Sequence, residues 1–170
     1  MKISMYEASV PMFVHTLKSL RVILEKGAAY AEAKKFDASV LANSRLFPDM
    51  LPLTRQVQIA SDAAKGAAAR LAGIDPPKFE DTEQTFPELI ARVDKTIDFL
   101  LSVKPEQLEG SEDRVITLKL RNESREFQGL HFLRHFAIPN FFFHVTTAYN
   151  ILRHNGVELG KADYLSGGAR

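Results

Sequence analysis

The sequence contains no cysteine, which excludes disulfide bonds, zinc–thiolate centres and cysteine nucleophiles. It also contains no run of about 18 apolar residues, the length that a helix needs to cross a bilayer. Residues 1–7 lack the long apolar stretch that follows the basic start of a signal peptide. We therefore expect a soluble, cytoplasmic protein that does not insert into a membrane.

The sequence has no large excess of charge of either sign. It carries 22 lysines and arginines against 21 aspartates and glutamates, whereas binding to a nucleic-acid backbone favours a clear basic surplus. We therefore expect no nucleic-acid partner. The length of 170 residues, with 45% hydrophobic and 25% charged residues, suits one globular domain that spans residues 1–170.

Four long segments have apolar residues at three- and four-residue steps, the pattern of amphipathic helices. The predicted helices span residues 4–34, 51–72, 86–103 and 139–153. Thr85 and Glu88 form a capping box at the start of the third helix, and Gly73 is placed to end the second. Asp37 is placed to cap a short helix that extends to about Leu46.

Between the third and fourth long helices the sequence changes character. Residues 115–120 are β-prone and partly alternating, and residues 125–128 return after a turn, which predicts a β-hairpin. Residues 130–138 form a short apolar segment without a capping signal, and we expect an irregular tail from residue 157 onward. The sequence thus predicts an all-α four-helix bundle with a small hairpin inserted before the last long helix.

His144 lies on the apolar face of the last predicted helix, with Phe141 and Ala148 on the same side. A buried imidazole needs a partner, because an unpaired polar group in a core costs roughly 1–3 kcal/mol. Gln56, at the edge of the apolar stripe of the second long helix, is the obvious partner. His144 then has three interpretations: a core histidine paired with Gln56, a ligand-binding histidine in a pocket between helices, or a metal ligand.

Three segments carry a resemblance to a known family: residues 45–50, residues 56–60 and the run 139–165. They resemble an uncharacterised family, known by a domain-of-unknown-function label, within the DinB/YfiT-like superfamily. The resemblance covers about residues 4–165. It implies a four-helix bundle that is often dimeric, so we expect a homodimer.

The resemblance also implies a divalent metal held by three histidines, one on the second helix and two spaced four apart on the fourth. Some members use the metal for thiol-dependent transfer or isomerisation with bacillithiol, mycothiol or glutathione. In this sequence the three positions fall at His144, Ala148 and, at or near, Gln56. Alanine supplies no ligand, and a neutral amide oxygen suits zinc or nickel poorly. We expect no cofactor, with zinc or nickel on His144 as the alternative.

Other candidate residues have less specific signals. Tyr149 is placed to add a hydroxyl to a pocket rim, and Asp49 is placed either to cap the second long helix or to act as a base, so both join the candidate ligand-binding residues. Gln58 and Asp62 fall on the polar side of the second helix, where we expect them to face solvent or a second subunit. Three other histidines are candidates for recruited metal ligands: His131, His135 and His154.

These observations predict a protein that binds an unknown small molecule in a pocket between the second and fourth long helices, around His144 and Gln56, with a degenerate metal site. One alternative is a metal-dependent thiol transferase or hydrolase, with ligands recruited from His131, His135 or His154. The other alternative is a non-catalytic dimeric protein, with a stress-response or scaffold role. The sequence does not decide whether the protein is an enzyme.

Overall fold

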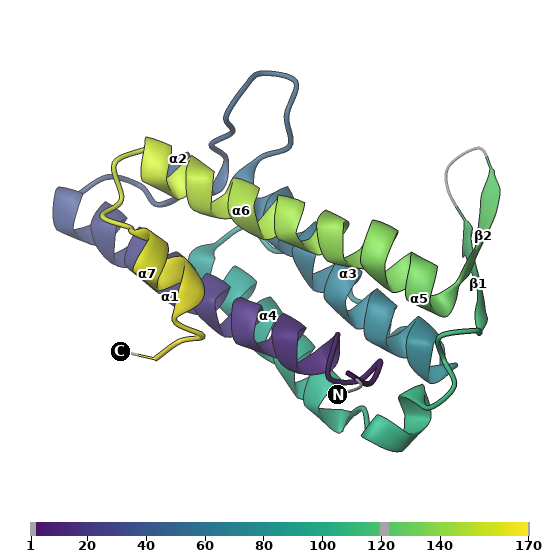
Figure 1. Ribbon diagram of the computed structural model, residues 1–170. Helices are drawn as coiled ribbons and strands as arrows, with labels where there is room; N and C mark the ends of the chain where they lie inside the picture. The colour runs from purple at the N-terminus through teal and green to yellow at the C-terminus, as the bar shows by residue number, and fades with distance from the viewer. Residues whose placement is uncertain (1–2, 120–122, 170) are drawn as a thin grey trace.

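The computed structural model describes residues 3–119 and 123–169. In this part of the chain the four long helices are α1 (Val10–Lys34), α3 (Leu53–Ala72), α4 (Phe86–Ser102) and α6 (Ile138–His154). The shorter helical elements are α2 (Ser39–Ala42), η1 (Pro105–Leu108), α5 (Gly129–Phe132), η2 (Leu133–Ala137) and α7 (Lys161–Leu165). Strands β1 (Val115–Lys119) and β2 (Ser124–Gln128) form an antiparallel hairpin. The predicted helical bundle with a hairpin before its last long helix is confirmed (Figure 1).

The helices of the bundle do not alternate in direction along the chain. Contacts between α1 and α4 join Arg21 to Asp94 and place Gly27 against Phe86, so these two helices are antiparallel. Residues Phe13 and Gly27 of α1 instead meet Phe141 and Leu152 of α6, so α1 and α6 are parallel.

Helix α3 is antiparallel to the continuous helical segment of α5, η2 and α6. Gln56 near the start of α3 contacts His144, and Leu71 near its end lies against Gly129. Because α4 opposes α1 and α3 opposes α6, α3 and α4 are parallel. The segment between them, residues 73–85, must therefore return along the length of the bundle.

Local sequence signals explain most of the helix ends. The Thr85 side chain accepts the backbone N–H of Glu88, and the Glu88 carboxylate accepts the backbone N–H of Thr85, which is the predicted capping box. The backbone N–H groups of Gln84 and Thr85 and the Thr85 hydroxyl donate to the Glu88 carboxylate and hold its pKa below its usual value. Gly73 ends α3 with a φ of 72°, a left-handed conformation that glycine adopts without a steric penalty. The Asp37 carboxylate accepts the N–H of Ser39, but α2 ends at Ala42 and not at Leu46.

Three further predictions were wrong. Helix α1 begins at Val10 because residues 5–9 form turns, and the tail contains the short helix α7, whose Asp163 accepts the backbone N–H of Gly160. Asp49 does not cap α3. It lies in a turn closed by the Met50 N–H and the Phe47 carbonyl, three residues before the cap residue Pro52.

The helix that carries His144 begins earlier than predicted. The chain is already helical from Gly129, and residues 133–137 form one wide π turn in which the Ile138 N–H donates to the Leu133 carbonyl. Pro139 explains this turn, because proline has no N–H and its ring clashes with the carbonyl four residues earlier. The helix continues past the proline as α6, with the π turn absorbing the clash.

Apolar side chains from all four long helices form one buried cluster, which includes Phe13, Leu53, Phe86 and Phe141. The hairpin adds Ile116 and Leu118, which alternate with exposed neighbours along β1 and cover one edge of the cluster. Among the described residues, no helix combines the length and the apolar composition that crossing a bilayer requires.

Candidate functional site

The candidate site is built around His144 and Gln56, which face each other across the interface of α6 and α3. The distance between His144 Nδ1 and Gln56 Oε1 is 2.7 Å, and both side chains are buried. Gln56 is fixed in turn, because its amide nitrogen donates to the carbonyl of Leu51 at 3.0 Å. The predicted pairing of the core histidine with Gln56 is therefore present in the structure.

This geometry defines the protonation of His144. Since the Gln56 nitrogen donates to Leu51, its oxygen is the atom that faces the imidazole and accepts a hydrogen bond from Nδ1–H. Burial lowers the pKa of His144 below its usual value, so the ring is neutral near pH 7. Nε2 then carries the lone pair, and within residues 3–119 and 123–169 no hydrogen bond to it is found.

The donors at this position do not fit the three-histidine metal centre that the superfamily resemblance implies. Ala148 is a fully buried methyl group, and the Gln56 oxygen already accepts the hydrogen bond from His144. One imidazole nitrogen therefore remains from a set of three ligands. We derive no reaction step through a metal at this site.

The other histidines do not complete a metal site in the described part of the chain. His131 and His135 lie side by side on the helix, with ring centroids 4.5 Å apart, and His131 stacks on Phe127. His154 lies at the last residue of α6 and is exposed. Over residues 3–119 and 123–169, no group of three or more histidine, aspartate or glutamate side chains is arranged to hold a metal ion.

Within residues 3–119 and 123–169, Tyr149 and Asp49 make no hydrogen bond to His144 or Gln56. The Tyr149 ring packs edge-on against Tyr164 of α7 at 5.9 Å and also contacts the buried core. Asp49 is exposed in the turn before α3. In the described part of the chain, neither residue lines any of five prominent surface cavities.

A cavity of about 730 Å³ opens along α3 and α6, beginning one helical turn from the hydrogen-bonded pair. We call it the α3–α6 cavity. Asn140 precedes His144 by one turn, and Ile59, Ala63 and Arg70 follow Gln56 at spacings that keep them on one face of α3. Its complete lining is Ile59, Asp62, Ala63, Arg70, Ile74, Asp75, Pro76, Thr117, Leu118, Lys119, Phe136 and Asn140. His144 and Gln56 lie beyond its end and are not part of its lining.

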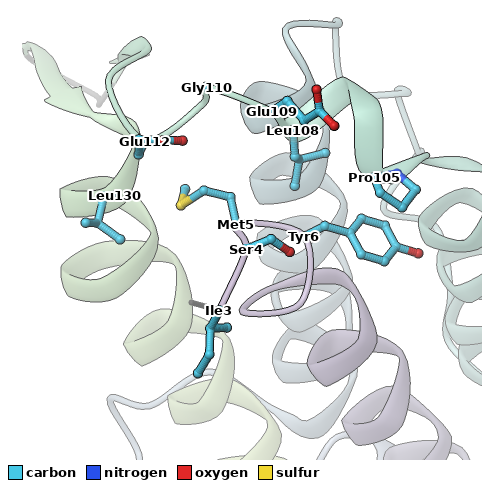
Figure 2. Close-up of a pocket in the computed structure, with 10 residues that line it drawn as sticks. All are labelled: Ile3, Ser4, Met5, Tyr6, Pro105, Leu108, Glu109, Gly110, Glu112 and Leu130. Carbon is cyan, nitrogen blue, oxygen red and sulfur yellow. The ribbon is translucent and has the colours of Figure 1, made fainter. Parts of the chain in front are cut away.

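A second cavity of about 530 Å³ lies near the start of α1. Its walls come from residues 3–6, from η1 and the turn that follows it, and from Leu130 of α5 (Figure 2). Among the described residues, its ionisable side chains are Tyr6, Glu109 and Glu112. It shares no residue with the α3–α6 cavity.

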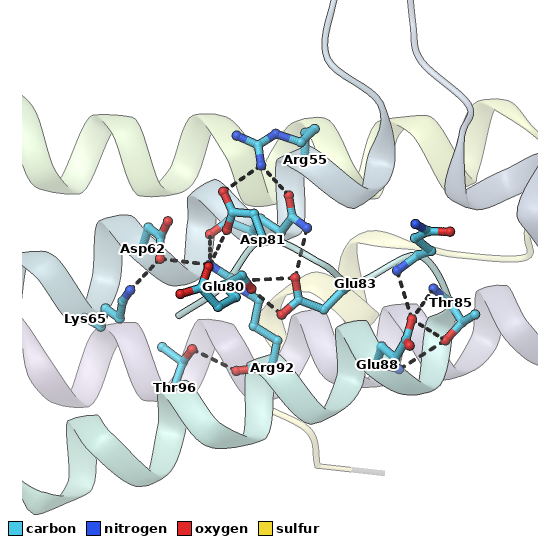
Figure 3. A network of polar contacts seen from close by, with 12 residues as sticks. Arg55, Asp62, Lys65, Glu80, Asp81, Glu83, Thr85, Glu88, Arg92 and Thr96 are labelled. Atoms are coloured by element: carbon cyan, nitrogen blue, oxygen red, sulfur yellow. Dashed lines mark hydrogen bonds and ion pairs between the residues drawn. The ribbon is translucent and has the colours of Figure 1, made fainter. Parts of the chain in front are cut away.

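The predicted exposure of Gln58 and Asp62 was wrong for Gln58, which is buried, and incomplete for Asp62, which is partly buried. Both belong to a polar network around Arg92, whose side chain is only 1% exposed (Figure 3). The Arg92 guanidinium contacts Asp62 at 2.9 Å, Asp81 at 3.0 Å and Glu83 at 3.0 Å. Gln58 joins the network by donating from its amide nitrogen to Glu83 at 2.9 Å.

The network holds the connection between α3 and α4, residues 73–85, against these two helices. Arg92 also donates to the backbone carbonyl of Glu80, and Arg55 binds Asp81 at 2.7 Å, so two helices hold one stretch of loop. Phe79 lies beneath Lys65 and Lys95, each 4.2 Å from its ring centroid. These contacts explain why parallel helices α3 and α4 tolerate the long connection between them.

Our sequence analysis missed Arg92 and Arg70. Arg92 had a detectable signal, since it lies three residues after Leu89 and four before Thr96, the spacing of a buried helix face. Arg70 had a weaker signal, a glycine four residues earlier in an otherwise alanine-rich helix. Neither signal indicates which other segments surround these side chains.

The fold defines a class: a DinB-like four-helix bundle with a small hairpin before its last long helix. The family model described as Domain of unknown function (DUF1993) matches residues 5–165, and the chain belongs to this family. It is similar to a crystal structure of a DinB family member protein from Shewanella denitrificans. The two share 44% identity and a TM-score of 0.89, covering 94% of this chain and 90% of that chain. No curated protein matches.

Proposed function

We propose that this protein binds a small organic molecule in the α3–α6 cavity. The neutral His144–Gln56 pair joins α3 to α6 just beyond one end of this cavity. The observation that carries the proposal is the cavity itself. Its volume of about 730 Å³ lies within the range of about 300–1,000 Å³ that is typical of small-molecule sites. Its walls combine apolar and polar or charged side chains in equal number, and small-molecule sites commonly lie between the helices of bundles.

The His144–Gln56 pair supports the proposal because it fixes α3 and α6 relative to each other. Gln56 is held at both ends of its amide, by Leu51 and by His144, so α3 and α6 are joined at a fixed register one turn from the cavity. A preformed cavity binds a ligand without the entropic cost of ordering its walls. The free lone pair of His144 Nε2 also offers an acceptor to a ligand that reaches the end of the cavity.

The test is a screen of small organic molecules by ¹H–¹⁵N correlation spectra of the untagged protein. We expect hits to shift the amide signals of Ile59, Ala63 and Asn140 together. Ala63→Trp fills the cavity and should abolish those shifts, whereas Ala91→Trp on the exposed face of α4 should not. The proposal fails if hits bind Ala63→Trp as tightly as the unsubstituted protein, or if a diverse library yields no hit at these residues.

The alternative of a metal-dependent thiol transferase or hydrolase needs donors beyond the superfamily positions. In the described part of the chain the available histidines are His131, His135 and His154, together with the exposed His15, and they form no three-ligand group with His144. The donor chemistry therefore favours binding without the superfamily metal. The non-catalytic dimeric alternative is separated by the same ligand screen, because it predicts no hit.

A further inference from the structure

We propose that the ligand of the α3–α6 cavity is an amphipathic organic anion, whose carboxylate or phosphate group is held by the guanidinium of Arg70. This inference rests on the proposed function and adds the chemical class of the ligand. Arg70 lines the α3–α6 cavity and also lines a neighbouring cavity of about 330 Å³. Arg70 thus borders both spaces, and its guanidinium lies over Gly66, a residue of the smaller cavity's wall.

Arg70 is exceptional among the partly buried arginines. The four others in the described chain each donate to an oxygen: Arg21, Arg55, Arg92 and Arg114. No such oxygen is found for Arg70 within residues 3–119 and 123–169. Burial lowers its pKa, because the cation loses hydration and no anion compensates for the loss. A guanidinium in this state presents a planar donor fork that matches a carboxylate or a phosphate.

Gly66 provides the space in which this guanidinium lies. A Cβ atom at residue 66 would overlap the Arg70 Nη1 atom, so the head group folds back over the glycine, one turn earlier on α3. Glycine inside a helix is unfavourable relative to alanine, and α3 uses alanine at most neighbouring positions. The space for the guanidinium gives a reason for glycine at this position.

The charges around Arg70 favour an anion. Asp62 also lines both cavities, but its carboxylate is already bound by Arg92 and Lys65. Lys119 on β1 adds a cation to the wall of the α3–α6 cavity, whereas Lys78 beside the neighbouring cavity is paired with Glu80 at 3.2 Å. Asp75 is the remaining acidic group in the lining, and it is exposed. A ligand ammonium at Asp75 is the competing arrangement, which the test below distinguishes.

The rest of the lining favours an apolar ligand body. Ile59 and Phe136 line the cavity from the two helical walls, and Ile74 is 41% exposed at its edge. Burying such surface against a ligand contributes favourably in proportion to the apolar area removed from water. A bare inorganic anion would leave this surface uncovered, so we infer a ligand with both parts.

The experiment compares probes that share one body: 3-phenylpropanoate, 3-phenylpropan-1-ol and 3-phenylpropylammonium, with inorganic phosphate as a charge-only probe. Dissociation constants come from ¹H–¹⁵N titrations followed at Ile59, Ala63 and Asn140. We expect the carboxylate to bind at least about tenfold more tightly than the alcohol, since a charge-assisted hydrogen bond contributes roughly that factor. We expect the ammonium and inorganic phosphate to bind more weakly still.

Two substitutions connect the preference to Arg70. Arg70→Gln should weaken 3-phenylpropanoate by about tenfold or more and make its affinity similar to that of the alcohol. Arg153→Gln, on the exposed end of α6, is the matched control and should leave every affinity unchanged. Gly66→Ala should leave the thermal midpoint unchanged or raised, because alanine suits a helix, yet weaken the carboxylate by displacing the guanidinium.

The outcomes separate this inference from the proposed function. If the alcohol binds at the same amides as tightly as the carboxylate, or if the ammonium binds best, Arg70 does not select an anion, while small-molecule binding stands. If Arg70→Gln and Gly66→Ala bind 3-phenylpropanoate as the unsubstituted protein does, the assignment to Arg70 is wrong. Absence of binding by every probe at millimolar concentration also overturns the inference, and the library screen then decides the proposed function alone.

Discussion

His144 Nδ1 and Gln56 Oε1 are 2.7 Å apart, although the two residues are separated by 88 positions in the chain. This hydrogen bond joins α6 to α3 inside the bundle, at the position where the superfamily resemblance places metal ligands. The amide oxygen accepts a hydrogen bond from the imidazole, so two protein side chains join the helices at this position. The α3–α6 cavity begins one turn further along the same helices.

The first prediction concerns the pH dependence of stability. Burial lowers the pKa of His144 in the folded state, so the unfolded chain, with a pKa near 6.5, binds this proton more readily. The contribution of His144 to stability is present in full above that pH and is lost as the pH falls toward the lower folded value. We expect urea unfolding at pH 7.5, 6.5 and 5.5 to show this loss in the unsubstituted protein.

His144→Asn removes this titration while keeping a polar group beside Gln56. We expect the free energy of unfolding of this variant to vary less between pH 7.5 and 5.5 than that of the unsubstituted protein. The lowered pKa values of Asp37, Asp81 and Glu88 belong to carboxyl groups, which titrate at lower pH. Equal slopes for the two proteins in this window would contradict the prediction.

The second prediction concerns the coupling between His144 and Gln56. Gln56→Leu leaves the buried Nδ1–H without an acceptor and should lower the free energy of unfolding by about 1–3 kcal/mol. Replacing both partners, with Gln56→Leu and His144→Phe together, should cost less than the sum of the single changes. Chemical denaturation of the four proteins of this cycle gives the interaction energy, and strict additivity would show that the hydrogen bond contributes nothing.

The third prediction concerns the network that holds the connection between α3 and α4. Arg92→Met leaves Glu83, which is 14% exposed, and the two aspartates without their shared cation, and should cost about 3 kcal/mol. Arg21→Met removes a surface ion pair with Asp94 and should cost less than about 1 kcal/mol. Urea denaturation measures both changes. A cost for Arg92→Met no larger than that for Arg21→Met would mean that the network does not stabilise the fold.

The fourth prediction concerns the junction between the hairpin and α5. A Cβ atom at Gly129 would overlap the backbone carbonyl of Ser111, which cannot move aside as a side chain can. Gly129→Ala should therefore destabilise the protein by about 1–3 kcal/mol, the usual cost of overpacking. Gly160→Ala is the control, because nothing lies within 4 Å of its added methyl group. Equal thermal midpoints for the two variants would contradict the close approach.

The fifth prediction concerns the oligomeric state. The family resemblance implies a homodimer, and Phe143 on α6 is 57% exposed beside the buried His144. We expect sedimentation to give the mass of a dimer and Phe143→Ser to shift the equilibrium toward monomer, because the exposed ring would be buried in the contact. Leu101→Ser, which replaces a side chain that is 60% exposed on α4, is the matched control. A monomer at micromolar concentration would show that the expectation of a dimer is wrong.

The elements that follow local rules were predictable. Thr85 and Glu88 cap α4 as expected, because a capping box involves only four consecutive residues. Gly73 ends α3 for a similarly local reason. The hairpin before the last long helix was predicted as well, whereas the early start of that helix was missed, since the π turn depends on how Pro139 is accommodated within a longer helix.

The same distinction between local and tertiary features applies to the candidate site. The sequence by itself determined that His144 lies on an apolar helix face and needs a partner, because helical periodicity and the cost of an unpaired imidazole are local facts. Only the tertiary structure decided that α3 and α4 run parallel, that Arg92 holds their connection, and that Arg70 forms no ion pair within residues 3–119 and 123–169. Those features arise where segments distant in the chain meet, and pairwise packing of that kind leaves no periodic signal in the sequence.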